Sequence, residues 1–233
     1  MPLCYSHAAM STVAIRHLSK VDPVMRALIR RVGAGGLAVR DQQPFETLVR
    51  AIAHQQIHGR AAEAILGRWL ALFPGRRFPT PAAVAAMPAG KMRRAGFSRG
   101  KIRAIKHIAR RARDGFVPTR RTCHGLSDEA LIERLTELHG VGQWTVEMLL
   151  MFTLGRPDVL PVGDFGVREG FRVAYGLRKH PHPKIVLAHG ERWRPHRSTA
   201  AWYLWRAAEA AKAKAAGAYT PGGAGGGTSR GPR

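Results

Sequence analysis

The order of apolar and polar residues along the chain predicts helices and no strands. Between residues 44 and 57, apolar side chains recur every three or four positions, as on the buried face of an amphipathic helix. Residues 98–113 repeat this spacing with basic residues on the other faces. No stretch alternates with the period of two that marks a half-buried strand. The pattern therefore predicts an all-α fold.

Capping residues and helix breakers set the ends of these elements. Asp22 and Pro23 form an N-cap and a first helical residue, and Gly33 ends the helix that they start. Ser127 begins a helix that runs to residue 138. Further helices are expected at residues 61–73, 81–87, 88–96, 143–154, 164–175 and 199–216.

The chain divides into three parts. Its 233 residues, 45% of them hydrophobic, suffice for two helical lobes that share a cleft. We expect these lobes within residues 21–216, after a loose N-terminal segment at residues 1–20. Residues 217–233 are rich in glycine and are expected to be disordered.

The chain is strongly basic, with 38 Lys and Arg against 15 Asp and Glu and a formal net charge of +23. Such an excess favours a polyanionic partner, although a coding bias towards arginine and alanine also raises the charge. Twelve Lys or Arg and one acid lie between Lys91 and Arg121, whereas eight acids lie between Asp128 and Glu169. A surface that binds nucleic acid, beside a site that uses a carboxylate, fits this distribution.

The two cysteines, Cys4 and Cys123, are too few for a disulfide framework, a cysteine-based zinc site or a four-cysteine iron–sulfur cluster. This composition suits a reducing cytoplasm. No signal-peptide core follows Met1, and no apolar run is long enough to cross a bilayer. We therefore expect no membrane partner.

Residues 138–142, Leu-His-Gly-Val-Gly, form a glycine-rich hairpin between two helical segments. Two glycines allow a tight turn with positive φ, and the helix that follows presents free N–H groups that attract a phosphate. An ordinary helix–helix turn explains the same residues. The candidate phosphate-binding residues are His139, Gly140, Val141, Gly142, Gln143 and Thr145.

A single aspartate, Asp164, follows Pro161-Val162-Gly163 and precedes an apolar, helical run. Its position alone is that of an N-cap, where aspartate is favoured. A capped carboxylate is also held rigidly, so capping is compatible with a catalytic role.

Together these motifs resemble the helix-hairpin-helix (HhH-GPD) DNA glycosylase superfamily, and within it the 3-methyladenine DNA glycosylase II branch. The segments that carry the resemblance lie between Pro44 and Ala208 and read PFETLVRAIAHQQI, AGFSRGKIRAI, GQWTVEMLLMFTLGRPDVLPVGDFGVR and WRPHRSTAAWYLWR. The resemblance implies an enzyme that flips a damaged base out of DNA and removes it. Larger relatives carry an N-terminal β domain, for which this chain has no room before Pro44, so we expect a short form.

The resemblance assigns a catalytic role to Asp164. In similar enzymes this aspartate faces the sugar of the flipped nucleotide, stabilises the developing oxocarbenium ion and orients the attacking water. Bifunctional relatives place a lysine nucleophile where this chain has Trp144, so no Schiff base forms there and a monofunctional enzyme is expected. Alkylated purines such as 3-methyladenine and 7-methylguanine need no general acid, because they are cationic and leave as neutral molecules.

The same resemblance indicates a base pocket and a wedge that fills the gap left by the flipped base. Trp144 offers an electron-rich face to a cationic base, Met148 lies one turn later, and Trp202 is a third candidate. Core packing is the alternative for each, and Tyr203 and Trp205 are left unassigned. The wedge candidates, which also read as ordinary polar residues at a helix end, are Gln55, Gln56 and Ile57.

The expected partner is double-stranded DNA that contains alkylated bases, bound by a monomer in the bacterial cytoplasm at the nucleoid. His54 and His58 are four residues apart, but the glutamate of an HExxH motif is absent, so no metal site is expected. The family allows a monovalent cation at the hairpin carbonyls, and no other cofactor is expected.

Two other functions stay open. A non-catalytic helix-hairpin-helix DNA-binding protein would keep the hairpin, but the intact VGDFGV around Asp164 argues against it. A glycosylase for deaminated or oxidised bases is the second, and the missing lysine and missing cluster cysteines weigh against most such branches.

Overall fold

The computed structural model describes residues 7–75 and 78–218. Over these residues the fold is all-α and contains no strand, as the apolar pattern predicts. No described helix is long and apolar enough to cross a membrane. The helices are α1 (His7–Val21), α2 (Pro23–Val32), α3 (Pro44–His54), α4 (Gly59–Leu70), α5 (Pro81–Ala86), α6 (Ala89–Ala95), α7 (Arg99–Arg113), α8 (Arg120–Cys123), α9 (Asp128–Thr136), α10 (Gln143–Phe152), α11 (Phe165–Ala174), α12 (Pro183–Gly190), the 3-10 helix η1 (Glu191–Trp193) and α13 (Arg197–Ala218).

Side-chain caps start several helices where the sequence places them. Asp22 Oδ1 accepts a hydrogen bond of 3.0 Å from the Met25 amide at the start of α2. Ser127 Oγ accepts one of 3.1 Å from the Ala130 amide at the start of α9. Each bond satisfies an amide that has no partner within its helix. The ends are less well predicted, since α4 and α10 stop a few residues earlier than the apolar pattern indicates.

The N-terminal segment corrects the expectation that residues 1–20 are loose. From His7 onwards the chain forms α1, in which Ala14 and Leu18 are 2% and 0% exposed. These residues lie four positions apart on one face, and α1 contacts α2, α13 and η1. The helix is thus held by tertiary packing. The short helices α8 and α12 were also not anticipated.

The expected disordered tail begins inside the last helix. Residues 217 and 218 complete α13, and residues 219–233 lie outside the described part of the chain. The predicted disorder of those residues therefore stays a prediction.

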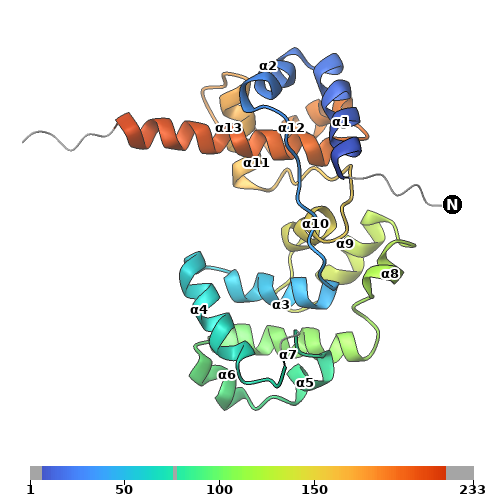
Figure 1. Cartoon of the computed structure of the whole chain (residues 1–233), viewed down its shortest axis with the longest axis vertical. Coiled ribbons are helices and arrows are strands. Elements are labelled where there is room, and N and C mark those ends of the chain that lie inside the picture. Colours follow the sequence, from blue (N-terminus) through green and yellow to red (C-terminus); the bar gives the residue numbers. More distant parts are fainter. Residues whose placement is uncertain (1–6, 76–77, 219–233) are drawn as a thin grey trace, which may run out of the picture.

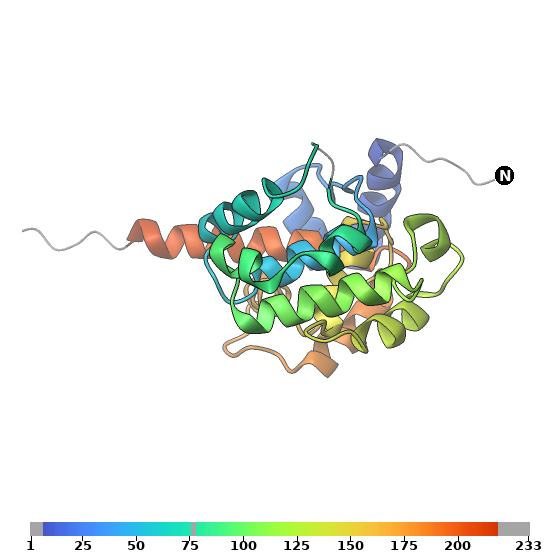
Figure 2. The same cartoon turned by 90° about the horizontal axis from the view of Figure 1, so that it is seen from below.

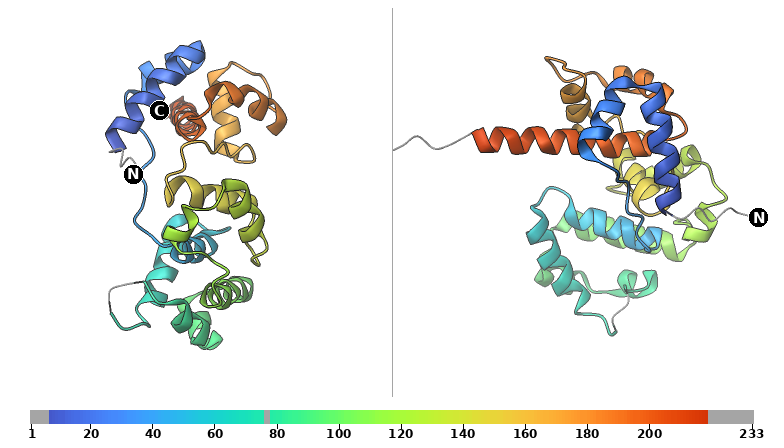
Figure 3. Two further views of the ribbon diagram at one scale, coloured as in Figure 1. Left: turned by 90° about the vertical axis from the view of Figure 1, so that its right-hand side faces the viewer. Right: turned by 45° about the horizontal axis from the view of Figure 1, so that its top comes forward.

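The helices form two groups along the longest axis of the molecule. In Figure 1, α1, α2 and α11 to α13 lie in the upper group and α3 to α9 in the lower one, with α10 between them. The side view in Figure 3 shows the same separation. In the lower group α7 packs against α3 and α5, and Figure 2 shows α7 running across the underside. α10 contacts α3 and α9 and then leads by a loop to α11.

A buried aspartate ties the upper group together. Asp22 Oδ2 accepts hydrogen bonds from Tyr175 Oη at 2.5 Å, His189 Nε2 at 2.9 Å and Trp193 Nε1 at 2.9 Å. Burial acts to raise the pKa of Asp22, but the donors from these side chains and from the Met25 amide outweigh it and lower the pKa to about 2. One carboxylate thus links the start of α2 to the end of α11, to α12 and to η1.

The crossing of α11 over α13 depends on a close approach of their backbones. A Cβ atom added at Gly170 would lie 1.9 Å from the carbonyl oxygen of Leu204. Only glycine fits at this point, so the two helices pack more closely than side chains would allow. This crossing fixes the position of the residues that begin α11 relative to one face of α13.

Candidate active site

Asp164 begins α11 and caps it. Its Oδ1 atom accepts a hydrogen bond of 2.8 Å from the amide of Val167, three residues later. The capping role predicted from the sequence is therefore confirmed. The cap fixes the carboxylate at the point where α11 begins.

Two indole groups from other helices also donate to this carboxylate. Trp144 Nε1, in the first turn of α10, lies 2.7 Å from Asp164 Oδ2. Trp205 Nε1, on α13, lies 2.8 Å from Asp164 Oδ1. With the Val167 amide, three N–H groups thus donate to one carboxylate. They come from three helices and leave the carboxylate little freedom to rotate.

The structure assigns a place to Trp205, which sequence reasoning left unassigned. Its indole stacks on Phe152 at the end of α10, with ring centroids 5.7 Å apart and an interplanar angle of 24°. Trp202, the pocket candidate from α13, lies elsewhere: a Cβ added at Gly35 would come within 2.3 Å of its indole. No described contact joins Trp202 to Asp164. Of the tryptophans on α13, the structure thus brings Trp205 to the carboxylate.

Exposed apolar side chains lie next to the carboxylate in the sequence and in space. Trp144 is 48% exposed and Phe165, directly after Asp164, is 67% exposed. Phe165 packs on the ring of His180 with centroids 4.9 Å apart. Met148, one turn after Trp144, is half-buried and packs against the core. Large apolar groups that stay exposed beside a fixed carboxylate offer a surface for a flat ligand.

The hairpin has the tight turn expected, but it uses one left-handed glycine instead of two. Gly140 has φ 83°, whereas Gly142 is extended with φ −98°. A Cβ at Gly140 would lie 3.2 Å from Ala104 Cβ and 3.3 Å from Ile52 Cδ1, so the turn packs directly on α7 and α3. At Gly142 no atom lies within 4 Å of such a Cβ, which leaves the N-terminus of α10 open.

The hairpin amides divide into bonded and free groups. The Val141 amide donates to Leu138 O at 3.0 Å, and the Thr145 amide donates to Gly142 O at 2.9 Å. Among the described residues, the amides of Gly140, Gly142 and Gln143 find no acceptor. These three are the hairpin amides that can hold a phosphate, and Val141 and Thr145 do not offer theirs.

His139 is held by two partners from α7. Its amide donates to His107 Nδ1 at 3.1 Å, and its Nε2 accepts from Arg103 Nε at 3.1 Å. Burial lowers the pKa of His107, and the charges of Arg110, Arg111 and His139 lower it further. The lowered pKa agrees with the hydrogen bond, in which His107 Nδ1 accepts from the His139 amide and so carries no proton. His139 can still present its ring to DNA, but not its amide.

The three wedge candidates differ in their surroundings. Gln55 Nε2 donates to the carbonyl of Gly140 at 3.0 Å and so fastens the end of α3 to the hairpin. Gln56 has φ 56°, a left-handed conformation that non-glycine residues rarely adopt. Gln56 is exposed and Ile57 is 38% exposed. Gln56 and Ile57 therefore project from a loop that Gln55 braces.

A buried acid, Glu147, lies near the carboxylate and was not singled out from the sequence. It is 5% exposed, and its Oε1 accepts from Gln143 Nε2 at 2.9 Å. Burial raises the pKa of Glu147, the Gln143 bond opposes this, and the charge of Asp164 raises the pKa further. The signal in the sequence is an acid within an apolar helix, four residues after a glutamine.

The histidines near the wedge have structural partners. His54 Nε2 lies 3.0 Å from Glu63 Oε1, and His58 Nδ1 accepts from the Arg60 amide at 3.4 Å as the N-cap of α4. Two hairpin carbonyls, those of Leu138 and Gly140, accept the bonds from Val141 and Gln55 described above.

Comparison with known proteins places this arrangement among DNA repair proteins. Residues 49–195 match the model of the HhH-GPD superfamily of base excision DNA repair proteins. The chain is 42% identical over 202 residues to "DNA-3-methyladenine glycosylase 1" of Schizosaccharomyces pombe, a match that covers 86% of this chain and 89% of that protein.

Solved structures give the same picture. The 3-methyladenine DNA glycosylase (Mag1) of Schizosaccharomyces pombe, in complex with abasic DNA, matches with a TM-score of 0.75 at 42% identity, over 83% of this chain and 95% of that one. A DNA-3-methyladenine glycosidase from Bacillus halodurans matches with a TM-score of 0.79 at 33% identity, over 86% of this chain and 91% of that one.

Proposed function

The chain belongs to the HhH-GPD superfamily of base excision DNA repair proteins, and from this membership we propose that it is a DNA glycosylase that removes alkylated bases from duplex DNA. The observation that carries the proposal is the Asp164 carboxylate, held by three N–H donors beside the exposed face of Trp144. The names of its relatives support 3-methyladenine as a substrate, and 7-methylguanine is included in the proposal because it too is a cationic methylated purine.

Asp164 stabilises positive charge on the sugar. When the bond between C1′ and the base breaks, its electron pair leaves with the base and an oxocarbenium ion forms at C1′. A carboxylate fixed in advance lowers the energy of this ion without having to reorganise. Water then adds to C1′ and Asp164 takes its proton, which leaves an abasic site.

Alkylation explains how one catalytic carboxylate suffices. A base methylated at N3 or N7 carries a positive charge, which the departing electron pair neutralises, so no acid has to protonate it. The same charge favours contact with the indole of Trp144, a residue that is 48% exposed. Trp205, fixed on Phe152, completes the apolar wall behind the carboxylate.

The enzyme performs no lyase step. A Schiff base requires an amine nucleophile, and the position where bifunctional relatives have lysine is Trp144, whose Nε1 donates to Asp164. The abasic strand therefore stays intact until another agent cuts it.

DNA is bound by the hairpin, residues 138–142, and by the loop at residues 55–57 that carries the wedge candidates. The free amides of Gly140, Gly142 and Gln143 hold a backbone phosphate. Gln56 and Ile57, which project beside the hairpin, fill the gap that the flipped base leaves. One copy of the chain supplies all of these groups, so the enzyme acts as a monomer.

Release of free bases from defined duplexes tests the proposal. Duplexes with a single 7-methylguanine, hypoxanthine or 8-oxoguanine are incubated with the protein, with and without alkali afterwards. We expect excision of 7-methylguanine, with strand cleavage only after alkali. Cleavage without alkali would contradict the monofunctional mechanism, and excision of 8-oxoguanine alone would contradict the substrate class.

A further inference from the structure

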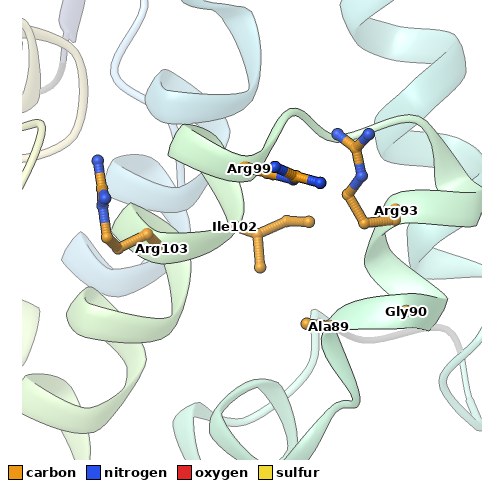
Figure 4. A pocket seen from close by; sticks show the side chains of 6 residues that line it. All are labelled: Ala89, Gly90, Arg93, Arg99, Ile102 and Arg103. Atoms are coloured by element: carbon orange, nitrogen blue, oxygen red, sulfur yellow. The ribbon is translucent and has the colours of Figure 1, made fainter.

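A pocket lined by arginines lies between α6 and α7, away from Asp164. A pocket of about 390 Å³ is lined by Ala89, Gly90, Arg93, Arg99, Ile102 and Arg103. Figure 4 shows the guanidinium groups of Arg93 and Arg99 facing one another, with Arg103 on the other side of Ile102. Three arginines and no carboxylate thus line the pocket, and two of the guanidinium groups, those of Arg93 and Arg99, face one another.

These positive charges are not neutralised within the protein. Among the described residues, Arg99 and Arg103 are exposed and pair with no carboxylate, and Arg93 Nη1 donates to the backbone oxygen of Phe97 at 3.1 Å. By contrast, Lys101 donates to Ala53 O at 2.7 Å and so serves the fold. Facing guanidinium groups repel each other, and a ligand with several anionic oxygens relieves this repulsion while accepting their hydrogen bonds.

One residue of the pocket lining also contacts the hairpin. Arg103 Nε donates to the ring of His139, the hairpin residue that precedes the free amide of Gly140. Arg103 thus connects the phosphate-binding amides to the side of α7 that carries Arg99. A strand that follows this surface from the hairpin meets Arg103 and then the pocket.

We propose that this pocket binds a second backbone phosphate of the DNA duplex, in addition to the phosphate at the hairpin. The proposal rests on the proposed function, because it takes duplex DNA as the ligand. The chemistry recognised is a phosphate group, and the connection to the hairpin through Arg103 favours a phosphodiester of the bound duplex over a free phosphate. The site adds affinity and no sequence preference, because it contacts only the backbone.

Salt dependence of DNA binding tests the site. The dissociation constant of an undamaged duplex is measured by fluorescence anisotropy between about 50 and 200 mM salt, where each phosphate contact contributes about 0.9 to the slope of log K against log salt. The variants are Arg99→Gln, Arg99→Gln with Arg103→Gln, and the control Arg113→Gln. Arg113 lies at the other end of the same helix, outside the pocket, so the control removes a positive charge from α7 without touching the site.

We expect the double variant to lose about 0.9 from the slope, the single variant to lose part of this, and the control to change little. An unchanged slope in the double variant overturns the proposal. An equal loss in the control also overturns it, because the effect would then reflect general charge. Thermal unfolding checks the fold, and Arg99→Gln alone, which breaks no described contact, decides the matter if the double variant is unstable.

Two further measurements complete the test. The first asks whether the phosphate in this pocket belongs to DNA, and the second separates the pocket from the proposed function. Calorimetry with inorganic phosphate alone distinguishes the source: phosphate binding with an unchanged DNA slope overturns the assignment to DNA. Excision of 7-methylguanine under saturating enzyme is measured in parallel. If the wild-type protein excises no base, the proposed function is contradicted. If the double variant nevertheless has a smaller salt slope than wild type, the proposal that this pocket binds a DNA phosphate is still supported.

Discussion

At the scale of single residues, the site depends on hydrogen bonds to one carboxylate. Asp164 and Trp144 could be singled out from the sequence because the segment that holds them resembles the helix-hairpin-helix glycosylases, whereas position alone indicated only a helix cap and a core residue. Trp205 could not, because α13 also carries Trp202 and Tyr203 nearby, and which of them meets Asp164 depends on how the helix is rotated against α11. Glu147 was missed for the same reason, since its burial depends on tertiary packing.

Trp205→Phe removes one donor to Asp164 and keeps a ring to stack on Phe152. A hydrogen bond to a charged group is worth about 1.5–3 kcal/mol, so we expect the single-turnover rate of base excision to fall by about tenfold or more. Affinity for the duplex should change little.

Trp202→Phe is the matched control, because it removes an indole N–H on the same helix that has no described contact with Asp164. It should excise at close to the wild-type rate. Equal losses in the two variants would show that the Trp205 bond does not matter for catalysis.

At the scale of elements, caps and apolar spacing predicted most helices, but not their packing. Asp22, Ser127 and Asp164 all cap helices as expected. The helix α1 was missed because it is held by packing against α2, α13 and η1, which buries Ala14 and Leu18 and which no local signal reports. The acceptors of the Val141 and Thr145 amides were likewise not predicted, because they are set by the folded turn.

The crossing of α11 and α13 gives a test at this scale. Gly170→Ala would place a methyl group against the backbone of Leu204, which cannot move without separating the helices. We expect the free energy of unfolding to fall by about 3 kcal/mol, as in severe overpacking. Gly67→Ala, within α4 and with open space around the added Cβ, should instead stabilise by about 0.5–1 kcal/mol. Urea unfolding of both variants checks this contrast, and equal effects would refute it.

The Asp22 network predicts a pH dependence of stability. The pKa of Asp22 is lowered from 3.8 to about 2 in the folded protein, so its carboxylate form stabilises the fold. The contribution, about 2 kcal/mol, is complete above the unfolded value and disappears as the pH falls from about 4 towards 2. Asp22→Asn should therefore cost stability at pH 6 and progressively less below pH 4.

Urea unfolding at several pH values measures this difference. Asp41→Asn is the control, because the Asp41 side chain is fully exposed. A destabilisation by Asp22→Asn that is the same at pH 6 and pH 3 would contradict the assigned pKa.

At the scale of the whole molecule, the net charge accounts for the affinity for a polyanion, and the arrangement of the helices accounts for the position of Asp164. The net charge of +23 favours a polyanion, and the structure places Arg103 against His139 of the hairpin, while Asp164 lies where α10, α11 and α13 meet. The all-α class followed from periodicity alone. How the upper and lower groups of helices meet did not, because it depends on long-range contacts such as the hydrogen bond from Trp144 on α10 to Asp164 at the start of α11.

The most direct measurement is single-turnover excision of 7-methylguanine from a defined duplex by wild type and Asp164→Asn. Asparagine still caps α11, so the helix should be preserved and the negative charge alone removed. The account predicts that the variant binds the duplex as tightly as wild type but excises the base at least about a hundredfold more slowly, as for the loss of a principal electrostatic group. Excision by the variant at the wild-type rate would contradict a catalytic role for Asp164.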